Sequence, residues 1–254
     1  MKLKLATLSA LTIFLLACTP TAGASPQDSF HEGAVSYRAG DYQAAEDSWR
    51  SSLEGGLHSG DVYYNLGNAL FRRDELGQAI LAWRVAELRL PRDPDVKANL
   101  DHARAQVRDD LEPPTTPALL FWQRALSLNE SYLLGALSLG LAMLIFGLLK
   151  SKIASSERLI AMKSVLTGAM YLSLGVGVLL GISTAYVANS LPTGVVLEDE
   201  VVFRSAIGAD GVELFALHAG AEVLVAERDA GHVLVVLPDD RRGWAADSAV
   251  GVVQ

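Results

Sequence analysis

Residues 150–163 read KSKIASSERLIAMK and separate two long uncharged segments. Residues 132–149 contain no charged side chain over eighteen positions, and residues 164–188 contain none over twenty-five. At about 1.5 Å per residue, each segment is long enough as an α-helix to cross a hydrocarbon core about 30 Å thick. The sequence therefore predicts two transmembrane helices, over 132–149 and 164–188.

The connecting loop has a charge excess opposite to that of the whole chain. It carries Lys150, Lys152, Arg158 and Lys163 against Glu157, whereas the chain has 21 basic and 29 acidic side chains. Short loops rich in Lys and Arg stay on the cytoplasmic side of a membrane, and contact with anionic headgroups is compatible with that position. We therefore expect a helical hairpin in the bacterial inner (cytoplasmic) membrane, with both flanking domains in the periplasm.

The amino terminus independently predicts the same topology. Residues 1–24 contain two lysines, an apolar run and then small residues, which is typical of a secretory signal. Two processing routes stay open: cleavage after the A-x-A motif that ends at Ala24, or a lipobox in which Cys18 becomes the lipidated first residue. Cys18 is the one cysteine of the chain, so we expect no internal disulfide and no cysteine-based metal site.

Residues 62–91 read VYYNLGNALFRRDELGQAILAWRVAELRLP and carry the pattern of a helical repeat. The small residues Gly67 and Ala79 allow two antiparallel helices to approach closely. Trp83 and other large side chains fill the seam between them, and Pro91 ends the second helix. The spacing of these residues resembles the tetratricopeptide repeat.

A shift of 34 residues towards the amino terminus maps Gly67 onto Gly33 and Trp83 onto Trp49. We therefore expect two repeats and a capping helix over residues 27–110. Repeat arrays bury their cores by stacking and need about three units for independent stability. Two repeats with a cap are expected to lean on the membrane, on a partner or on a second copy.

In the tetratricopeptide family, the inner faces of the first helices line a groove that holds an extended segment of another protein. The resemblance implies a groove lined by Phe30, Tyr37, Arg38, Tyr64, Asn65, Asn68, Phe71, Arg72 and His102. The two asparagines suit hydrogen bonds to a peptide backbone, and the two arginines suit a carboxylate. As an alternative, Tyr64 and Phe71 partly fill the seam between the helices.

The chain changes character on both sides of the predicted hairpin. Residues 111–131 contain three prolines within EPPTTP, which exclude a helix there, and then aromatic side chains suited to a membrane interface. From residue 194 onward, short alternating apolar runs punctuated by glycines predict about five strands, hence a small β-barrel over 194–254.

The carboxy-terminal pattern resembles a bacterial SH3-type domain. Phe203-Arg204-Ser205 matches an early strand of that family, and Gly243-Trp244 matches a late one. Trp244 suits a core position and a ligand platform equally well. Gly231-His232 departs from the family, which commonly has a second G-W there, so a thinner ligand-stacking surface is expected.

Gly177 and Gly181 form a G-x-x-x-G motif inside the second uncharged segment. A dinucleotide-binding loop would follow a strand, and this motif does not. We therefore expect these glycines to pack against the first uncharged segment.

Composition and motifs argue against two function classes. The five histidines are scattered singly, and neither a nucleophile elbow nor a P-loop occurs, so we expect a non-catalytic protein without metal or cofactor. Residues 27–117 carry 10 basic and 16 acidic side chains, and residues 194–254 carry 4 and 11. Such acidic domains exclude nucleic acid as a partner.

The order of these parts resembles the BatE-type proteins of the Bacteroides aerotolerance operons, and "YYNLGNA" at 63–69 is part of that resemblance. It implies a multidomain membrane scaffold acting with von Willebrand A-domain membrane proteins and a MoxR-type ATPase in stress tolerance or envelope maintenance. Two alternatives stay open: a cell-wall tether whose SH3-type domain binds peptidoglycan, and a factor that handles or assembles lipoproteins.

Overall fold

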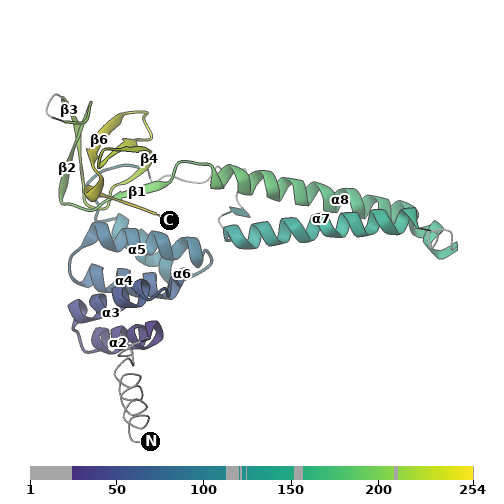
Figure 1. The fold of residues 1–254 in the computed structure, drawn as a ribbon, viewed down its shortest axis with the longest axis horizontal. Coiled ribbons are helices and arrows are strands. Elements are labelled where there is room, and N and C mark those ends of the chain that lie inside the picture. The colour runs from purple at the N-terminus through teal and green to yellow at the C-terminus, as the bar shows by residue number, and fades with distance from the viewer. Residues whose placement is uncertain are drawn as a thin grey trace, which may run out of the picture. The chain divides into compact units, whose positions relative to one another are not determined.

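The computed structural model describes residues 25–112, 120, 122–123, 125–151, 157–208 and 211–253, with the backbone alone for 157–161 (Figure 1). The predicted signal, including Cys18, and most of the EPPTTP segment lie outside these residues. The chain divides into two compact units, one ending at His58 and one beginning at Ser59.

The first unit contains one helical hairpin, formed by α2 (Pro26–Arg38) and α3 (Tyr42–Glu54). Ser25 and Asp28 form a capping box at the start of α2, in which each side chain accepts from the other residue's backbone N–H. Asp41 caps α3 by accepting from the N–H of Ala44 at 3.0 Å. Both helix starts are thus encoded locally.

The second unit opens with three helices built on the same plan, α4 (Gly60–Arg72), α5 (Leu76–Arg89) and α6 (Pro94–Arg104). Their starts follow the 34-residue period, because the caps of α2, α4 and α6 are Ser25, Ser59 and Asp93. A left-handed residue ends the turn after the first helix of each hairpin, namely Gly40 at φ 84° and Asp74 at φ 62°. The helical repeat expected from the sequence is present.

The two hairpins are closed by equivalent contacts. The Trp49 Nε1–H donates to the carbonyl of Phe30 at 3.2 Å, and the Trp83 Nε1–H donates to the carbonyl of Tyr64 at 3.2 Å. A Cβ on Gly67 would lie 2.6 Å from the Trp83 ring, so only glycine lets the indole cross the helix at that distance. Each tryptophan therefore joins the two helices of its hairpin.

The long apolar helices α7 (Leu128–Lys150) and α8 (Glu157–Ala188) lie side by side as an antiparallel pair (Figure 1). α7 begins four residues before the expected start at 132. Residues 157–163 are helical rather than part of the connecting loop, whose residues 152–156 lie outside the description. Leu128–Lys150 and Met162–Ala188 are each long and apolar enough to cross a membrane.

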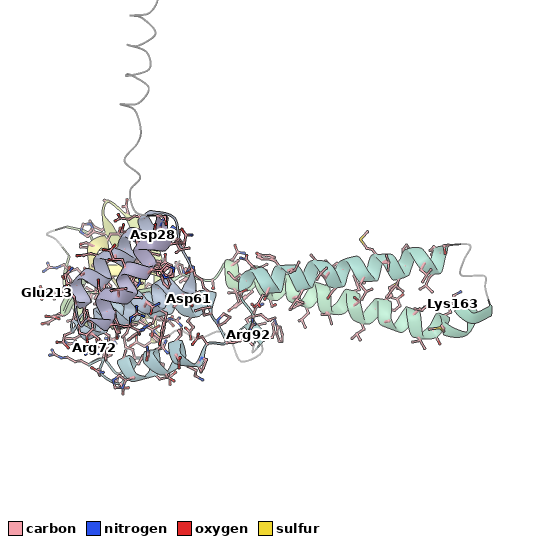
Figure 2. All side chains as sticks on the ribbon, turned by 90° about the horizontal axis from the view of Figure 1, so that it is seen from below. Asp28, Asp61, Arg72, Arg92, Lys163 and Glu213 are labelled. Atoms are coloured by element: carbon pink, nitrogen blue, oxygen red, sulfur yellow. The ribbon has the colours of Figure 1, made fainter. Side chains whose placement is uncertain are left out.

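The apolar side chains of this pair point mostly outward (Figure 2). Met143 is 76% exposed and Leu172 is 71% exposed, and many neighbouring apolar side chains are exposed as well. Water-soluble proteins rarely expose contiguous apolar surface on this scale. The pair therefore needs apolar surroundings that the described residues do not provide.

Seven strands form one antiparallel sheet at the carboxyl end, with the order β3-β2-β6-β5-β4-β1-β7. They are β1 (Thr193–Val196), β2 (Glu200–Arg204), β3 (Glu213–His218), β4 (Glu222–Asp229), β5 (His232–Val236), β6 (Arg242–Ala246) and β7 (Val250–Val252). The expected number of about five strands is too low, because β6 and the short β7 are separated only by a 3₁₀ turn over Asp247–Ala249 and read as one run. Valines, Phe203 and Leu237 fill the core.

The sheet packs against the helices of its own unit. Val107 and Leu111, which follow α6, contact the core of the sheet. Gly77 at the start of α5 touches the backbone of Val196 and Leu197, where no side chain would fit. Within this unit, packing against the β-sheet domain stabilises the helical repeat. That support was not among those expected from the sequence.

Candidate functional site

The first unit carries three of the residues predicted to line a groove. The Tyr37 ring packs against Tyr42 and Trp49, with centroid distances of 5.2 and 5.8 Å. The Phe30 ring meets His31 edge-on at 5.7 Å, and Arg38 is exposed at the end of α2. Tyr37 is therefore partly a seam residue, whereas Arg38 is accessible.

In the second unit, Tyr64, Asn65 and Asn68 are half-buried along α4. The Asn65 amide donates to the carbonyl of Asp61 at 2.8 Å. Asn68 Oδ1 accepts from Trp83 Nε1 at 3.2 Å and from Asn99 Nδ2 at 2.9 Å. Asn68 therefore links α4, α5 and α6, and its oxygen is already used inside the repeat.

At the end of α4, aromatic and basic side chains gather. The half-buried Phe71 ring lies 5.5 Å from Trp83 and meets His102 of α6 edge-on at 5.6 Å. His102 contacts the Gln106 amide at 3.2 Å, and Arg72 is exposed. The structure thus brings Phe71 and His102, two of the residues predicted to line the groove, into contact.

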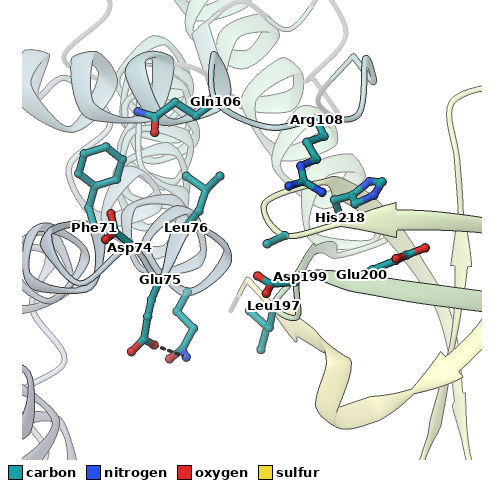
Figure 3. A pocket seen from close by; sticks show the side chains of 12 residues that line it. Phe71, Asp74, Glu75, Leu76, Gln106, Arg108, Leu197, Asp199, Glu200 and His218 are labelled. Atoms are coloured by element: carbon teal, nitrogen blue, oxygen red, sulfur yellow. Dashed lines mark hydrogen bonds between the residues drawn. The ribbon is translucent and has the colours of Figure 1, made fainter.

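A cavity of about 580 Å³ lies beyond Phe71, between the helices and the sheet of the second unit (Figure 3). Its lining comes from Phe71, Asp74, Glu75, Leu76, Gln78, Gln106, Arg108, Leu197, Asp199, Glu200, His218 and Ala219. The volume falls within the range of about 300–1,000 Å³ typical of ligand sites. The sequence did not predict this site, because its two walls lie about a hundred residues apart in the chain.

The helical wall of the cavity is held by short local contacts. Asp74 adopts the left-handed conformation in the turn between α4 and α5, a position at which Asp is tolerated better than most residues. Glu75 follows it and contacts Arg73 at 2.7 Å and the Gln78 amide at 2.6 Å. The turn thus directs one exposed carboxylate and one paired carboxylate towards the cavity.

Buried ion pairs lie beside the cavity and join the sheet to the helices. Glu222 of β4 is only 4% exposed, and its Oε1 accepts from Arg104 Nε at 2.7 Å. Its Oε2 lies 2.9 Å from Arg84 Nε, an ion pair without hydrogen-bond geometry. Burial opposes the charge on Arg104, but the hydrogen bond and the charge of Glu222 outweigh it and raise the pKa of Arg104.

Asp109 makes a second link between the helical segment and the sheet. Its Oδ2 accepts from the backbone N–H of His218 at 2.7 Å, and its Oδ1 lies 3.1 Å from His218 Nδ1. His218 is the last residue of β3, an edge strand of the sheet. One carboxylate therefore holds both the backbone and the ring of a residue that lines the cavity.

Arg92 connects the repeat to the start of the apolar pair. It donates to Glu130 Oε1 and to the carbonyl of Ala125, each at 2.7 Å, and lies beside the pair in Figure 2. The hydrogen bond and charge of Glu130 raise the pKa of Arg92. Nearby, Gln123 donates to Ser183 Oγ at 2.8 Å, so the segment before α7 also contacts α8.

The two glycines of the G-x-x-x-G motif differ in their surroundings. A Cβ on Gly177 would lie 2.7 Å from Leu139 Cγ and 3.2 Å from the carbonyl of Gly135, so α7 and α8 approach each other closely at this glycine. A Cβ on Gly181 would meet no described atom within 4 Å. Gly177 lies where packing requires glycine, whereas Gly181 does not.

Trp244 of β6 is half-buried and pairs in register with Arg204 of β2 and Leu234 of β5. Beside the preceding residue Gly243, the rings of Phe203 and Phe215 stack at 5.1 Å, and the Arg241 guanidinium lies 5.2 Å from the Phe215 ring centroid. The Trp244 side chain is thus partly buried and partly accessible. Its position is compatible with both roles expected for it.

Comparison of the chain with protein-family profiles and with curated proteins finds no match. Assignment of its function therefore rests on its own residues.

Proposed function

We propose that this chain is a non-catalytic membrane scaffold whose tetratricopeptide-type repeats and SH3-like domain bind other proteins outside the cytoplasm. The observation that carries this proposal is the 34-residue repeat of helix caps and Trp-to-carbonyl hydrogen bonds. Such repeats present the inner helix face to extended segments of partners. In the second unit, that face carries Tyr64, Asn68 and Phe71.

The exposed apolar surface of α7 and α8 supports the membrane part of the proposal. Lys163 lies near the end of the pair where the two helices connect (Figure 2), and the other cations of 150–163 belong to the same connection. The excess of Lys and Arg favours a cytoplasmic position for this end. The repeat and the β-sheet domain would then share the opposite, periplasmic side.

The proposed partner class is membrane protein rather than nucleic acid, because both flanking domains are acidic. The BatE-type resemblance suggests von Willebrand A-domain membrane proteins and a MoxR-type ATPase as the surrounding system, linked to stress tolerance or envelope maintenance. The order of the helical repeat, apolar pair and β-sheet domain supports this choice.

Site-specific photocrosslinking in intact membranes tests the scaffold. A benzophenone side chain replaces Tyr64 on the inner face of α4, and in a matched control it replaces Asp47, which is exposed on α3. We expect one discrete adduct with a membrane protein from position 64 and none from position 47. Equal labelling from both positions, or no adduct from position 64, would contradict the proposal.

The competing cell-wall tether makes a different prediction. If the SH3-like domain binds peptidoglycan through Trp244, the full chain in detergent will sediment with isolated sacculi, and Trp244→Ala will abolish this. We expect no such retention.

Protease digestion of spheroplasts tests the topology separately, since both flanking domains should be degraded while the apolar pair is protected.

A further inference from the structure

The cavity of the second unit has charged and apolar walls. Phe71, Leu76 and Leu197 supply apolar surface, and carboxylates reach it from both walls: Asp74 and Glu75 from the helices, Asp199 and Glu200 from the sheet (Figure 3). Arg108 is the one lysine or arginine among its lining residues. The cavity therefore favours a ligand that carries positive charge next to an apolar group.

Most of these charges are not used within the described part of the chain. Glu75 is paired with Arg73, but the side chains of Asp74, Asp199 and Glu200 form no ion pair or hydrogen bond with any described residue, and neither does Arg108. Carboxylates held along a cleft without partners are available for charge-assisted hydrogen bonds with guanidinium or ammonium groups. Within the described part of the chain, these charges of the cavity thus stay without partners.

The arrangement of the carboxylates argues against a metal ion as the ligand. Among the described residues, no three His, Cys, Asp or Glu side chains are placed to hold a metal. The carboxylates are distributed along opposite walls rather than directed at one point (Figure 3). An extended ligand with side chains of its own fits this distribution better than a single ion does.

Asp74 offers a comparison within the chain. Its equivalent 34 residues earlier is Gly40, and both residues have positive φ. Glycine adopts this conformation without strain, whereas aspartate pays a conformational cost. The second repeat therefore carries a carboxylate, at the cavity, at a position where glycine is sufficient for the turn of the first repeat.

We propose that this cavity binds a polypeptide segment of a partner protein that carries an arginine or lysine next to an apolar residue. The basic side chain lies between Asp74 on one wall and Asp199 and Glu200 on the other, and the apolar residue packs on Phe71, Leu76 and Leu197. Phe71 also belongs to the predicted groove, so the cavity extends that groove towards the β-sheet domain. The inference rests on the proposed scaffold function and specifies its partner.

Fluorescence polarisation on the full chain in detergent tests this site. The probes are two labelled octapeptides, GLRGLRGS and GLEGLEGS, which differ only in having arginine or glutamate at two positions. We expect the arginine peptide to bind at least about tenfold more tightly, and this difference to shrink when salt rises from about 0.05 M to about 0.5 M. Equal binding of both peptides, or no binding of either, would overturn the proposal.

Three variants locate the binding. Asp74→Gly removes one carboxylate and introduces the residue found at the equivalent turn, so its fold is retained. The double variant Asp199→Asn/Glu200→Gln neutralises the opposite wall. We expect each variant to bind the arginine peptide about three- to tenfold more weakly. The matched double variant Glu227→Gln/Asp229→Asn removes the same charge from exposed positions of β4 and should leave binding unchanged.

The outcomes separate this site from the scaffold itself. A crosslinked partner at position 64 together with equal affinity for both peptides would retain the scaffold and reject the cavity. Selective binding of the arginine peptide without a crosslinked partner would retain the cavity and reject the groove. If the matched control weakens binding as much as Asp199→Asn/Glu200→Gln does, the effect is net charge, and the cavity proposal fails.

Discussion

The hairpins α2–α3 and α4–α5 share one plan but differ in what surrounds their second helix. In α3 the buried residues are Ala45, Glu46, Trp49 and Ser52, of which Trp49 and Ser52 donate hydrogen bonds to backbone carbonyls of α2. In α5 they are Gly77, Ala79, Ile80, Ala82, Trp83, Val85 and Ala86, because α5 contacts both its own hairpin and the sheet. The same repeat can therefore serve as an end unit or as the centre of a domain, depending on the small residues on its outer face.

The largest expected effect comes from removing the central indole. Trp83 is 2% exposed, and Trp83→Ala should destabilise the second unit by about 3–5 kcal/mol by leaving a cavity between α4 and α5. Hydrogen exchange with mass spectrometry on the full chain in detergent should show lost protection in residues 60–108 and in the sheet.

The matched change in the other hairpin is Trp49→Ala, at a residue 1% exposed. The void that this substitution leaves should lower the free energy of unfolding by a similar amount, but the loss of protection should stay within residues 25–58. If Trp49→Ala also deprotects the sheet, the distinction between an end unit and a central unit is wrong.

A smaller loss is expected from breaking the ion pairs that join α5 and α6 to Glu222 of β4. Glu222→Gln leaves the Arg84 and Arg104 guanidiniums beside a neutral amide, and should cost about 2–4 kcal/mol. Thermal unfolding in detergent measures this loss. Glu227→Gln on the exposed part of the same strand should change stability by less than about 0.5 kcal/mol, and equal shifts in both variants would contradict the link.

Adding one methyl group where the two helices of each hairpin cross tests whether both hairpins are packed equally tightly. A Cβ at Gly67 would lie 2.6 Å from Trp83, and a Cβ at Gly33 would lie 2.5 Å from Trp49. Gly67→Ala and Gly33→Ala should each cost about 1–3 kcal/mol by overpacking. Ser51→Ala, at an exposed position of α3, is the control in the same unfolding experiment. A neutral Gly33→Ala would mean that the first hairpin relaxes more easily.

The smallest expected effect is the loss of stability at the amino-terminal cap of α2 when the pH is lowered. Asp28 accepts from the side chain and the backbone of Ser25, and these hydrogen bonds lower the pKa of Asp28 below its usual 3.8. A depressed pKa in the folded state contributes stability above the usual value, which is lost as the pH falls through the lowered one. The cap of α4 lacks this carboxylate, because Val62 occupies the equivalent position.

Acidification below about pH 3.8 should therefore loosen the first turn of α2 but not that of α4. Amide chemical shifts of residues 26–29, followed by NMR in detergent, should titrate with Asp28 and lose this dependence in Asp28→Asn. Parallel changes in residues 60–63 would show a general acid effect instead.

The parts of this fold that depend on local pattern were predictable. The pairs Gly33–Trp49 and Gly67–Trp83 are 34 residues apart and locate both hairpins, and the uncharged segments locate α7 and α8. The strand number was underestimated because β6 and the three-residue β7 are joined by a short 3₁₀ turn and read as one run. Gly181 was expected to pack like Gly177, but periodicity alone does not tell which glycine of a helix lies at the crossing.

The cavity was not predictable because it depends on how the sheet docks on the helices. Arg104 and Glu222 are 118 positions apart, and Asp109 and His218 are 109 apart. No local signal marks such pairs, since an acidic residue in a strand is usually solvated. Phe71 was predicted as a groove residue, and the structure also places it in the wall of the cavity, which the sequence did not indicate.

The contact between Asp109 and His218 has a consequence for solubility. An edge strand offers unpaired backbone groups on which the strands of other molecules can add, the first step of many aggregates. By occupying the N–H at the end of β3, the aspartate leaves an incoming strand one hydrogen bond fewer and confronts it with a negative charge. Asp109, which links the helical segment to the sheet, thereby also disfavours the addition of further strands at this edge.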